Sequence, residues 1–390
     1  MTVNRLAELW NFDLSVNFLN HGSFGAVPLE VDAAQLEFQL RANANPNRWF
    51  RFELPDLLIA ARQSTAKWLG VEEDRFAFVP NASQGVITAV QALVDDISAN
   101  SQRAHIIDTS LGYGGVQFGL RRVAQRSNAS FTTVALEYPD EITIDIITAR
   151  IRSAIDDSDR LAIVVLDLIT SNTAMLLPVA EIIVKLKADH PNTRFVIDGA
   201  HSACMLKNPL PIGFDVWVGN FHKWVCAPRP SAGLVCATKE IAELMAPLAP
   251  SWDYEYGFPR SFDWQGTSDY SAYLATPPAI EFLRQWSYEE LNTHNTTVVK
   301  AGAALLRHAW GVDRHVEESL EAPWMRMVRL PTSTAFTRDE CNTLIRKASI
   351  NLKSETTIMS VAGHNYVRLS AHMYNEMSDY TMLAELPQLI

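Results

Sequence analysis

Short apolar runs alternate with longer amphipathic stretches through the middle of the chain. Phe76–Val79, Ala162–Val165 and Leu234–Cys236 are apolar without a polar interruption, which predicts strands that are buried on both faces. Strands of this kind are typical of a mainly parallel sheet with helices on either side. We therefore predict an α/β layer over residues 56–250.

The pattern changes after residue 250. An aromatic stretch with few helix signals, Trp252–Tyr273, precedes one long helical pattern over Pro278–Ala309. Strand-like runs at Met327–Leu330 and Tyr366–Leu369 follow, mixed with helical segments, which predicts a smaller α+β unit. The chain is thus divided into an N-terminal segment, an α/β domain, a connecting or interface segment and a smaller α+β domain, at residues 1–55, 56–250, 251–275 and 276–390.

Composition narrows the class of protein. The 390 residues are 48% hydrophobic, which is enough for two domains with large cores. The formal net charge of −11 opposes nucleic-acid binding, because contacts to a phosphate backbone need clustered Lys and Arg. No apolar run approaches membrane-spanning length, and Glu8 and Asp13 interrupt the apolar core that a signal peptide needs. We expect a cytoplasmic protein with neither nucleic acid nor membrane as a partner.

The cysteines indicate no metal site and no disulfide framework. The sequence has no CxxC pair and no histidine at zinc-ligand spacing from a cysteine. Free thiols in a reducing compartment are the expectation. The four residues are Cys204, Cys226, Cys236 and Cys341.

Candidate ligand-binding residues follow the predicted strands, at the sheet edge where open parallel sheets bind ligands. Asn81, Ala82 and Ser83 lead from one strand into a helical pattern, where free N–H groups and the helix dipole suit a phosphate. An ordinary N-cap is the alternative, and this segment alone favours it. Tyr113 lies between glycines after the next strand, and its ring can stack on an aromatic ligand or simply pack on its neighbours.

Two further strand ends carry polar groups. The run Thr170–Thr173, which includes Asn172, offers donors to a ring hydroxyl or a substrate, although such runs are common in loops. Asp198 ends the strand that starts at Arg194, and His201 follows three residues later. A strand-end aspartate alone suits a metal, a ribose, a helix cap or a pyridinium about equally. His201 is either a ligand contact or a structural histidine.

Lys223 changes this balance. It lies between Phe221 and Trp224 just after an apolar run, so we expect a desolvated lysine with a lowered pKa and a free amine. An amine of this kind forms a Schiff base with an aldehyde, and a strand-end aspartate such as Asp198 keeps a pyridine nitrogen protonated. Together with a phosphate cradle and a ring-stacking aromatic, these groups predict pyridoxal phosphate as the cofactor.

The same residues resemble a known family. The chain is similar to fold type I pyridoxal-phosphate enzymes of the class V aminotransferase family, in the isopenicillin N epimerase-like group. The motifs that carry the resemblance are Phe18–Gly25, Asn45-Pro46, Asn81–Ser83, Asp198–His201, His222-Lys223, Gln265–Thr267 and Arg368–His372. The resemblance implies a mainly parallel seven-stranded sheet flanked by helices. It also implies a smaller α+β domain formed from C-terminal and N-terminal segments, with residues 1–55 packing on that domain and at the active-site entrance.

The resemblance also assigns roles. It implies that Lys223 forms the internal aldimine, that Asp198 pairs with the ring nitrogen and that His201 lies near the ring oxygen. Phosphate contacts are implied for the Asn81 turn, with Ala82, Ser83 and His222, and, from the partner subunit of a homodimer with shared active sites, for Gly266 and Thr267. Tyr113 would stack on the ring. Asn172 is assigned to the ring oxygen, although its turn departs from the Ser-Pro-Thr-Gly-like pattern of relatives.

Substrate contacts and chemistry follow from the same resemblance. Arg368 is expected to bind the carboxylate of an amino acid or amino-acid-like substrate in two parallel hydrogen bonds, and Asn20 and His21 to line the entrance unless they serve a turn. The substrate would form an external aldimine, and Lys223 would then take the Cα proton. Epimerisation or carbon–sulfur cleavage is the leading expectation. An aminotransferase and a regulatory module that only binds the cofactor are the alternatives.

One related activity is disfavoured by the cysteines. A cysteine desulfurase needs a nucleophilic cysteine on a mobile loop. Cys341 is predicted at the start of a helix with acidic neighbours, which disfavour a thiolate. Cys226 is near Lys223 but lies in a short apolar stretch, where a packing role is expected.

Overall fold

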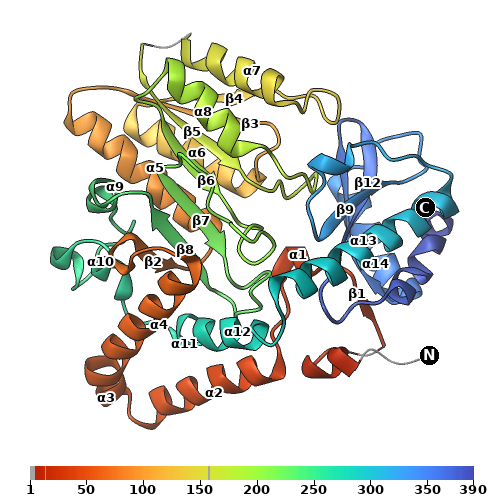
Figure 1. Cartoon of the computed structure of the whole chain (residues 1–390), viewed down its shortest axis with the longest axis horizontal. Helices are drawn as coiled ribbons and strands as arrows, with labels where there is room; N and C mark the ends of the chain where they lie inside the picture. The colour runs from red at the N-terminus through yellow and green to blue at the C-terminus, as the bar shows by residue number, and fades with distance from the viewer. Residues whose placement is uncertain (1–4, 14, 157–158) are drawn as a thin grey trace.

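The computed structural model describes residues 5–13, 15–156 and 159–390. At its centre is a seven-stranded sheet in the order β2-β8-β7-β6-β5-β3-β4 (Figure 1). From β4 to β7 neighbouring strands are parallel, whereas β8 is antiparallel to both β7 and β2. The mainly parallel seven-stranded sheet is therefore confirmed. The strands are β2 Phe76–Val79, β3 Ala104–Thr109, β4 Ser130–Val134, β5 Leu161–Asp167, β6 Arg194–Asp198, β7 Val216–Asn220 and β8 Ala232–Cys236.

Helices cover both faces of this sheet. Successive side chains of a strand point to opposite sides, and the apolar strands therefore present hydrophobic side chains on each face. Val164 and Ile197 belong to the core on one face, whereas Ile163 and Val196 belong to the core on the other. The first face is covered by α4 Leu54–Leu69, α7 Ile144–Asp156 and α8 Val179–Asp189. The second is covered by α5 Ala82–Ala99, α6 Gly114–Ser127 and α9 Lys239–Leu244.

A smaller unit with its own core lies beside this layer (Figure 1). Its antiparallel sheet has the order β11-β12-β9. The N-terminal segment joins it, because β1 pairs in parallel with β10. The predicted α+β unit built from both ends of the chain is thus confirmed, whereas the boundaries at residues 55, 250 and 275 stay a prediction. Its elements are β1 Asn17–Phe18, β9 Met325–Arg329, α14 Arg338–Leu352, β10 Ser354–Glu355, β11 Thr357–Val361 and β12 His364–Ser370.

One expectation was wrong in detail. The helical pattern over Pro278–Ala309 forms two helices, α12 Thr276–Leu283 and α13 Tyr288–Trp310. The break has a local cause, because Ser287 caps α13 in a reciprocal capping box with Glu290. Hydrophobic periodicity continues across the break and therefore hides it.

The remaining elements are short, apart from α2. No helix among the described residues combines the length and the apolar character needed to cross a membrane. The helices are α1 His21–Phe24, α2 Leu29–Ala44, α3 Pro46–Arg48, a π-helical turn Trp49–Glu53, α10 Arg260–Asp263 and α11 Ser271–Leu274. The 3₁₀ turns are Arg5–Leu9, Glu73–Arg75, Tyr254–Tyr256, Glu318–Leu320, Met377–Tyr380 and Met382–Leu389.

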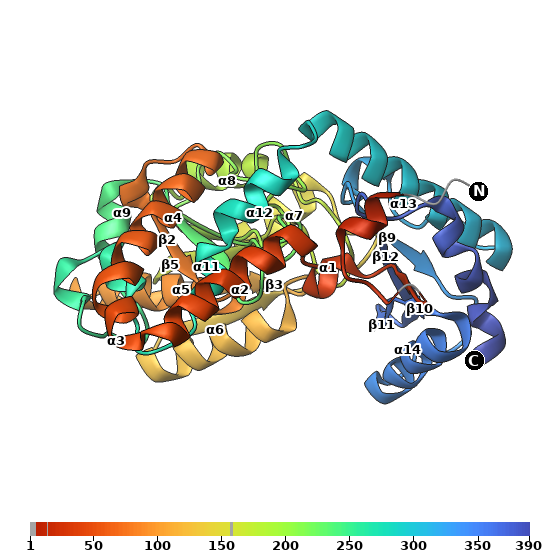
Figure 2. The same ribbon diagram turned by 90° about the horizontal axis from the view of Figure 1, so that it is seen from below.

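The N-terminal segment passes between the two units at α1 (Figure 2). Gly25 ends this helix with a φ of +69°, and a Cβ there would lie 1.8 Å from the carbonyl oxygen of His222. Only glycine allows this approach of two backbones. The close contact fixes the N-terminal segment against the loop that follows β7.

We predict that Gly25→Ala destabilises the protein more than Gly70→Ala. Gly70 has a similar φ of +72° but nothing within 4 Å of the added Cβ, so its cost is the left-handed backbone alone, about 1–2 kcal/mol. Gly25→Ala adds a steric clash worth about 1–3 kcal/mol more. Urea denaturation of both variants measures the difference in the free energy of unfolding. Equal losses would show that the Gly25 contact is not tight.

Candidate functional site

A cavity of about 390 Å³ lies at the carboxyl ends of the central strands, where the sheet meets α1 and the smaller unit. Residues far apart in sequence come together there, from Gly22 to Arg368. The sequence-predicted residues that line it are Asn81, Ala82, Ser83, Tyr113, Asp198, His201, His222, Lys223 and Arg368.

Lys223 is half-buried at the wall of this cavity, and its amine is poorly solvated. Burial, and then the positive charge of Arg368, lower the pKa of Lys223 to about 7, although the carboxylates of Asp198 and Asp167 oppose this. Its Nζ lies 3.1 Å from Nε2 of His201. A substantial fraction of the amine is therefore unprotonated near neutral pH, as a nucleophile requires.

The hydrogen bonds of His201 agree with a neutral lysine. The indole N–H of Trp224 donates to Nδ1 of His201 at 3.4 Å, and an indole nitrogen can only donate. The proton of neutral His201 is therefore on Nε2, which faces Lys223. Burial, and next the charges of Lys223 and Arg368, hold the pKa of His201 well below its usual range, so this histidine stays neutral.

Asp198 provides a buried carboxylate across the site. It ends β6 and its Oδ1 accepts the N–H of Ala200 at 3.0 Å. Burial raises its pKa, while the Ala200 N–H and the charge of Lys223 lower it. None of the ion pairs within the described residues includes Asp198, so its charge is available to a bound cation.

The start of α5 lies at the same cavity. Asn81 is the N-cap, with its side chain accepting the N–H of Gln84 at 2.9 Å, which confirms the N-cap interpretation. Nδ1 of His222 donates to the carbonyl of Ser231 at 2.8 Å. Ala82 and Ser83 occupy the first turn of the helix, where backbone N–H groups lack partners within the helix. The predicted phosphate role of this turn stays a prediction.

Arg368 lies on β12 and reaches the cavity from the smaller unit. Only 3% of it is exposed. It donates to Ser171, through the backbone carbonyl at 2.7 Å and the hydroxyl at 3.2 Å, and to Asn20 at 3.3 Å and Ser23 at 2.7 Å. All these acceptors are uncharged, and burial lowers the pKa of Arg368 to about 10. The guanidinium therefore lacks a carboxylate partner within the described chain.

Five predicted residues lie outside the cavity. Asn20 contacts two residues that line the cavity, Arg368 and Ser23. Asn172 is exposed, while its neighbour Ser171 faces the cavity, because the loop turns back through a bond between the hydroxyls of Thr170 and Thr173. Gly266 and Thr267 are apart from Lys223 in this chain, with Thr267 at another cavity of about 370 Å³. His21 is fully buried behind Lys223.

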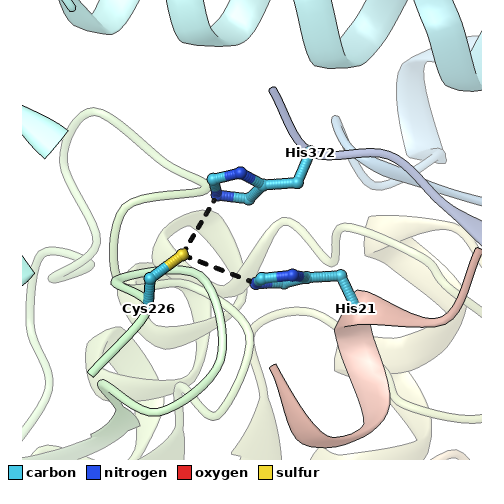
Figure 3. Close-up of side chains that lie close together, drawn as sticks. All are labelled: His21, Cys226 and His372. Atoms are coloured by element: carbon cyan, nitrogen blue, oxygen red, sulfur yellow. Dashed lines mark hydrogen bonds between the residues drawn. The ribbon is translucent and has the colours of Figure 1, made fainter. Parts of the chain in front are cut away.

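His21 belongs to a buried cluster with Cys226 and His372 (Figure 3). The Cys226 sulfur lies 3.6 Å from Nε2 of His372 and 3.9 Å from Nε2 of His21. The spacing suits a metal, since the three ligand atoms lie within 4.8 Å of one another. However, Nε2 of His21 also lies 2.9 Å from the carbonyl oxygen of Lys223. A carbonyl only accepts, so this nitrogen carries a proton and has no lone pair for a metal.

The cluster instead fixes the backbone of Lys223. With Nε2 of His21 donating to Lys223, Nδ1 accepts from the hydroxyl of Tyr374 at 2.8 Å. The ring of His21 also stacks on His372, with centroids 4.5 Å apart. Residues from the N-terminal segment and from the end of the smaller unit thus hold the lysine loop from behind.

Sequence reasoning gave no individual role to four polar residues of the cavity. Ser23, Ser171 and Asn220 hold other site groups, with Asn220 accepting the N–H of Ala82 at 2.8 Å. Asp167 is the fourth, and it ends β5 as Asp198 ends β6. The position of Asp167 at the end of an uninterrupted apolar run was a visible signal that sequence reasoning did not use.

The residues of the cavity fit pyridoxal phosphate. The cofactor needs an amine for its aldehyde, an anion for its ring nitrogen and N–H donors for its phosphate. Lys223, Asp198 and the first turn of α5 are of these types and line one cavity. Tyr113, which is 46% exposed, adds an aromatic ring to the lining.

Comparisons with known proteins agree with this chemistry. The chain is 27% identical to a probable chloroplastic L-cysteine desulfhydrase of Arabidopsis thaliana, covering 97% of this chain and 84% of the relative. It is 27% identical to isopenicillin N epimerase of Streptomyces clavuligerus, covering 96% and 94%. A solved structure of a C-DES mutant with glycine linked to its PLP cofactor matches with a TM-score of 0.75 at 16% identity, covering 97% and 98%.

The sequence model of the family described as Aminotransferase class-V matches residues 22–383, which is most of the chain. The chain therefore belongs to the class V aminotransferase family of pyridoxal-phosphate-dependent enzymes.

Proposed function

We propose that this enzyme cleaves the carbon–sulfur bond of an amino acid with sulfur on Cβ, with L-cysteine as the test substrate. The observation that carries the proposal is one cavity lined by an amine with a lowered pKa at Lys223, a buried carboxyl at Asp198 and an Arg368 guanidinium without a carboxylate partner in the described chain. The choice of reaction is supported by similarity to L-cysteine desulfhydrases over 97% of the chain.

The proposed cofactor contacts follow the chemistry of the lining. Lys223 binds the aldehyde, Asp198 the ring nitrogen and His201 the region of the ring oxygen. Ser83 offers its amide to the phosphate beside His222, Ala82 joins it by exchanging its bond to Asn220 for the phosphate, and Tyr113 offers its ring as a stacking surface. When bound, pyridoxal phosphate supplies an electron sink for a carbanion at the substrate Cα.

The protein residues then perform the proton transfer and the orientation. Arg368 receives the substrate carboxylate in a bidentate pair, which fixes the Cα–H bond relative to Lys223. Once the substrate amine displaces Lys223, its free Nζ accepts the Cα proton. The sulfur leaves from Cβ with the bonding electrons, and hydrolysis of the remaining product gives pyruvate and ammonia.

The cysteines support release of free sulfide. All four are buried, and burial raises the pKa of each thiol, with Cys204 at about 12. Cys226, the cysteine in the loop of Lys223, faces His21 and His372 rather than the cavity. A buried, protonated thiol is a poor sulfur acceptor, so a protein persulfide is disfavoured. Four free thiols also support our proposal of a reducing, cytoplasmic location.

Epimerisation is the second candidate, because the chain shares 27% identity with isopenicillin N epimerase of Streptomyces clavuligerus, the same percentage as with the plant relative. Removal of the Cα proton is common to both reactions. They differ in whether the proton returns to Cα from the opposite side or the Cβ substituent leaves.

We also propose a homodimer in which Gly266 and Thr267 complete the site of the partner subunit. Support comes from large apolar side chains that are exposed at the cavity and on α2. Phe24 lines the cavity yet is 67% exposed, and α2 exposes Leu36 and Leu40. A second copy covering this surface accounts for the exposure of such large apolar side chains.

Incubation with L-cysteine in deuterated water tests the reaction. We expect pyruvate, ammonia and sulfide in equal amounts. Deuterium at Cα with inverted configuration would replace this proposal by epimerisation, and a keto acid that retains the sulfur, without ammonia, would replace it by transamination. A protein that binds pyridoxal phosphate but leaves every amino acid unchanged would support the regulatory alternative.

The protonation state of Lys223 gives a second prediction. Attachment of pyridoxal phosphate to the cofactor-free protein should accelerate as pH rises through about 7, because protonated Lys223 is not nucleophilic and its pKa is about 7. Borohydride reduction after short incubations, followed by peptide mapping, measures the attachment. Lys223→Ala should trap nothing at the mapped peptide. A midpoint near the ordinary lysine value would contradict the buried neutral amine.

Replacement of Arg368 gives a third prediction. Arg368→Gln should lower kcat/KM for the amino acid roughly a hundredfold or more, because two charge-assisted hydrogen bonds of about 1.5 kcal/mol or more each are lost. Cofactor absorbance should remain. Arg329→Gln is the matched control, because Arg329 lies on the neighbouring strand β9 and contacts His364 outside the cavity. Equal effects of the two substitutions would argue against a carboxylate site at Arg368.

A further inference from the structure

Asp167 is a second buried carboxyl in the cavity, and none of the contacts assigned above uses it. It lines the cavity with only 8% of its surface exposed. Its Oδ2 accepts no hydrogen bond from any described residue. A buried oxygen without a donor is costly unless the group carries a proton or meets a ligand.

The sheet places Asp167 directly beside Asp198. The two residues are register partners at the ends of the parallel strands β5 and β6. Two adjacent buried carboxyls cannot both be ionised at low cost, because their like charges repel in a poorly solvated site. No ion pair among the described residues includes Asp167. One proton shared between the two carboxyls removes the repulsion and fills the place of the missing donor.

The surroundings decide which carboxyl carries the proton. Asp198 accepts the Ala200 N–H at 3.0 Å, and this bond stabilises its anion whether or not Lys223 is protonated. Asp167 faces the negative charges of Asp198 and of Asp108 on β3, with the backbone N–H of Tyr113 as an opposing influence. Burial, and next the charge of Asp198, raise the pKa of Asp167 well above its ordinary value, and a hydrogen bond between the two side chains adds to this.

We propose that Asp167 is a neutral acid that donates a hydrogen bond to Asp198 and so keeps Asp198 ionised for the ring nitrogen of the cofactor. Asp167 is thus a positioning residue that acts through Asp198. Asp198 needs such a donor because burial alone favours its protonated form. A protonated Asp198 cannot hold a ring cation. The role of the pair toward the cofactor rests on the proposed function, but the protonation state of Asp167 does not.

Infrared difference spectroscopy of the cofactor-free protein at pH 8 tests the protonation state. We expect a C=O stretch of a protonated carboxylic acid in the wild type that Asp167→Asn removes. Asp108→Asn is the matched control. Asp108 is a buried carboxyl on the adjacent strand outside the cavity, its pKa is about 6, and it is therefore ionised at pH 8. Absence of the band, or a band that survives Asp167→Asn, would overturn the proposal whether or not the enzyme cleaves cysteine.

A second measurement tests the action through Asp198. Asp167→Asn keeps a neutral donor of the same shape and should leave the dissociation rate of pyridoxal phosphate near that of the wild type. Asp167→Leu removes the donor, so dissociation should accelerate roughly tenfold to a hundredfold, the range for loss of a hydrogen bond to a charged group. The ¹⁵N shift of labelled cofactor should move toward the unprotonated ring only in Asp167→Leu. Equal behaviour of the two variants would overturn the role, and an unfolded Asp167→Leu leaves the infrared test decisive.

Discussion

The site depends on the removal of water from a lysine amine. Lys223 is a good nucleophile near neutral pH because burial and the nearby charge of Arg368 disfavour its ammonium form. The same burial makes the protonation state of the other polar groups in the cavity depend on their hydrogen-bond partners and on nearby charges. His201 remains neutral beside the amine, and Asp198 needs its hydrogen bonds to remain an anion. Desolvation therefore makes the lysine reactive and also forces the rest of the cavity to balance its charges.

The desolvation of Lys223 depends on several segments of the chain and not on the sheet alone. The strand edge supplies Asp198 and the loop of Lys223, but α1 and β12 close the cavity from the other side. Gly25 lets the N-terminal backbone approach His222, and His21 then reaches the carbonyl of Lys223. The pairing of β1 with β10 attaches the N-terminal segment to the smaller unit, next to the edge of the sheet that α1 covers.

The sequence predicted the parts of this arrangement that are local. Uninterrupted apolar runs identified β2, β5 and β8, and the aromatic flanks of Lys223, which are fully buried, indicated the desolvation of its amine. Family resemblance, rather than periodicity, brought Arg368 into the site. Sequence reasoning could not predict the direction in which individual side chains of a loop point, or where a helix begins. Whether Ser171 or Asn172 faces the cavity is decided by a bond between Thr170 and Thr173 inside the loop, and the break before α13 by one capping serine.

Asp167 was left out of the predicted site for a different reason. Its position after an apolar run was as visible as that of Asp198, but an isolated strand-end aspartate suits several ligands, so neither residue alone specifies a cofactor. Their pairing depends on the register of β5 and β6, which are consecutive strands and lie side by side in the sheet with Asp167 opposite Asp198. Once the two ends are adjacent, electrostatics requires one carboxyl to be neutral. A site that must hold a cationic ring on a buried anion then gains from a neutral acid behind that anion, because the acid stabilises the charge without adding a second one.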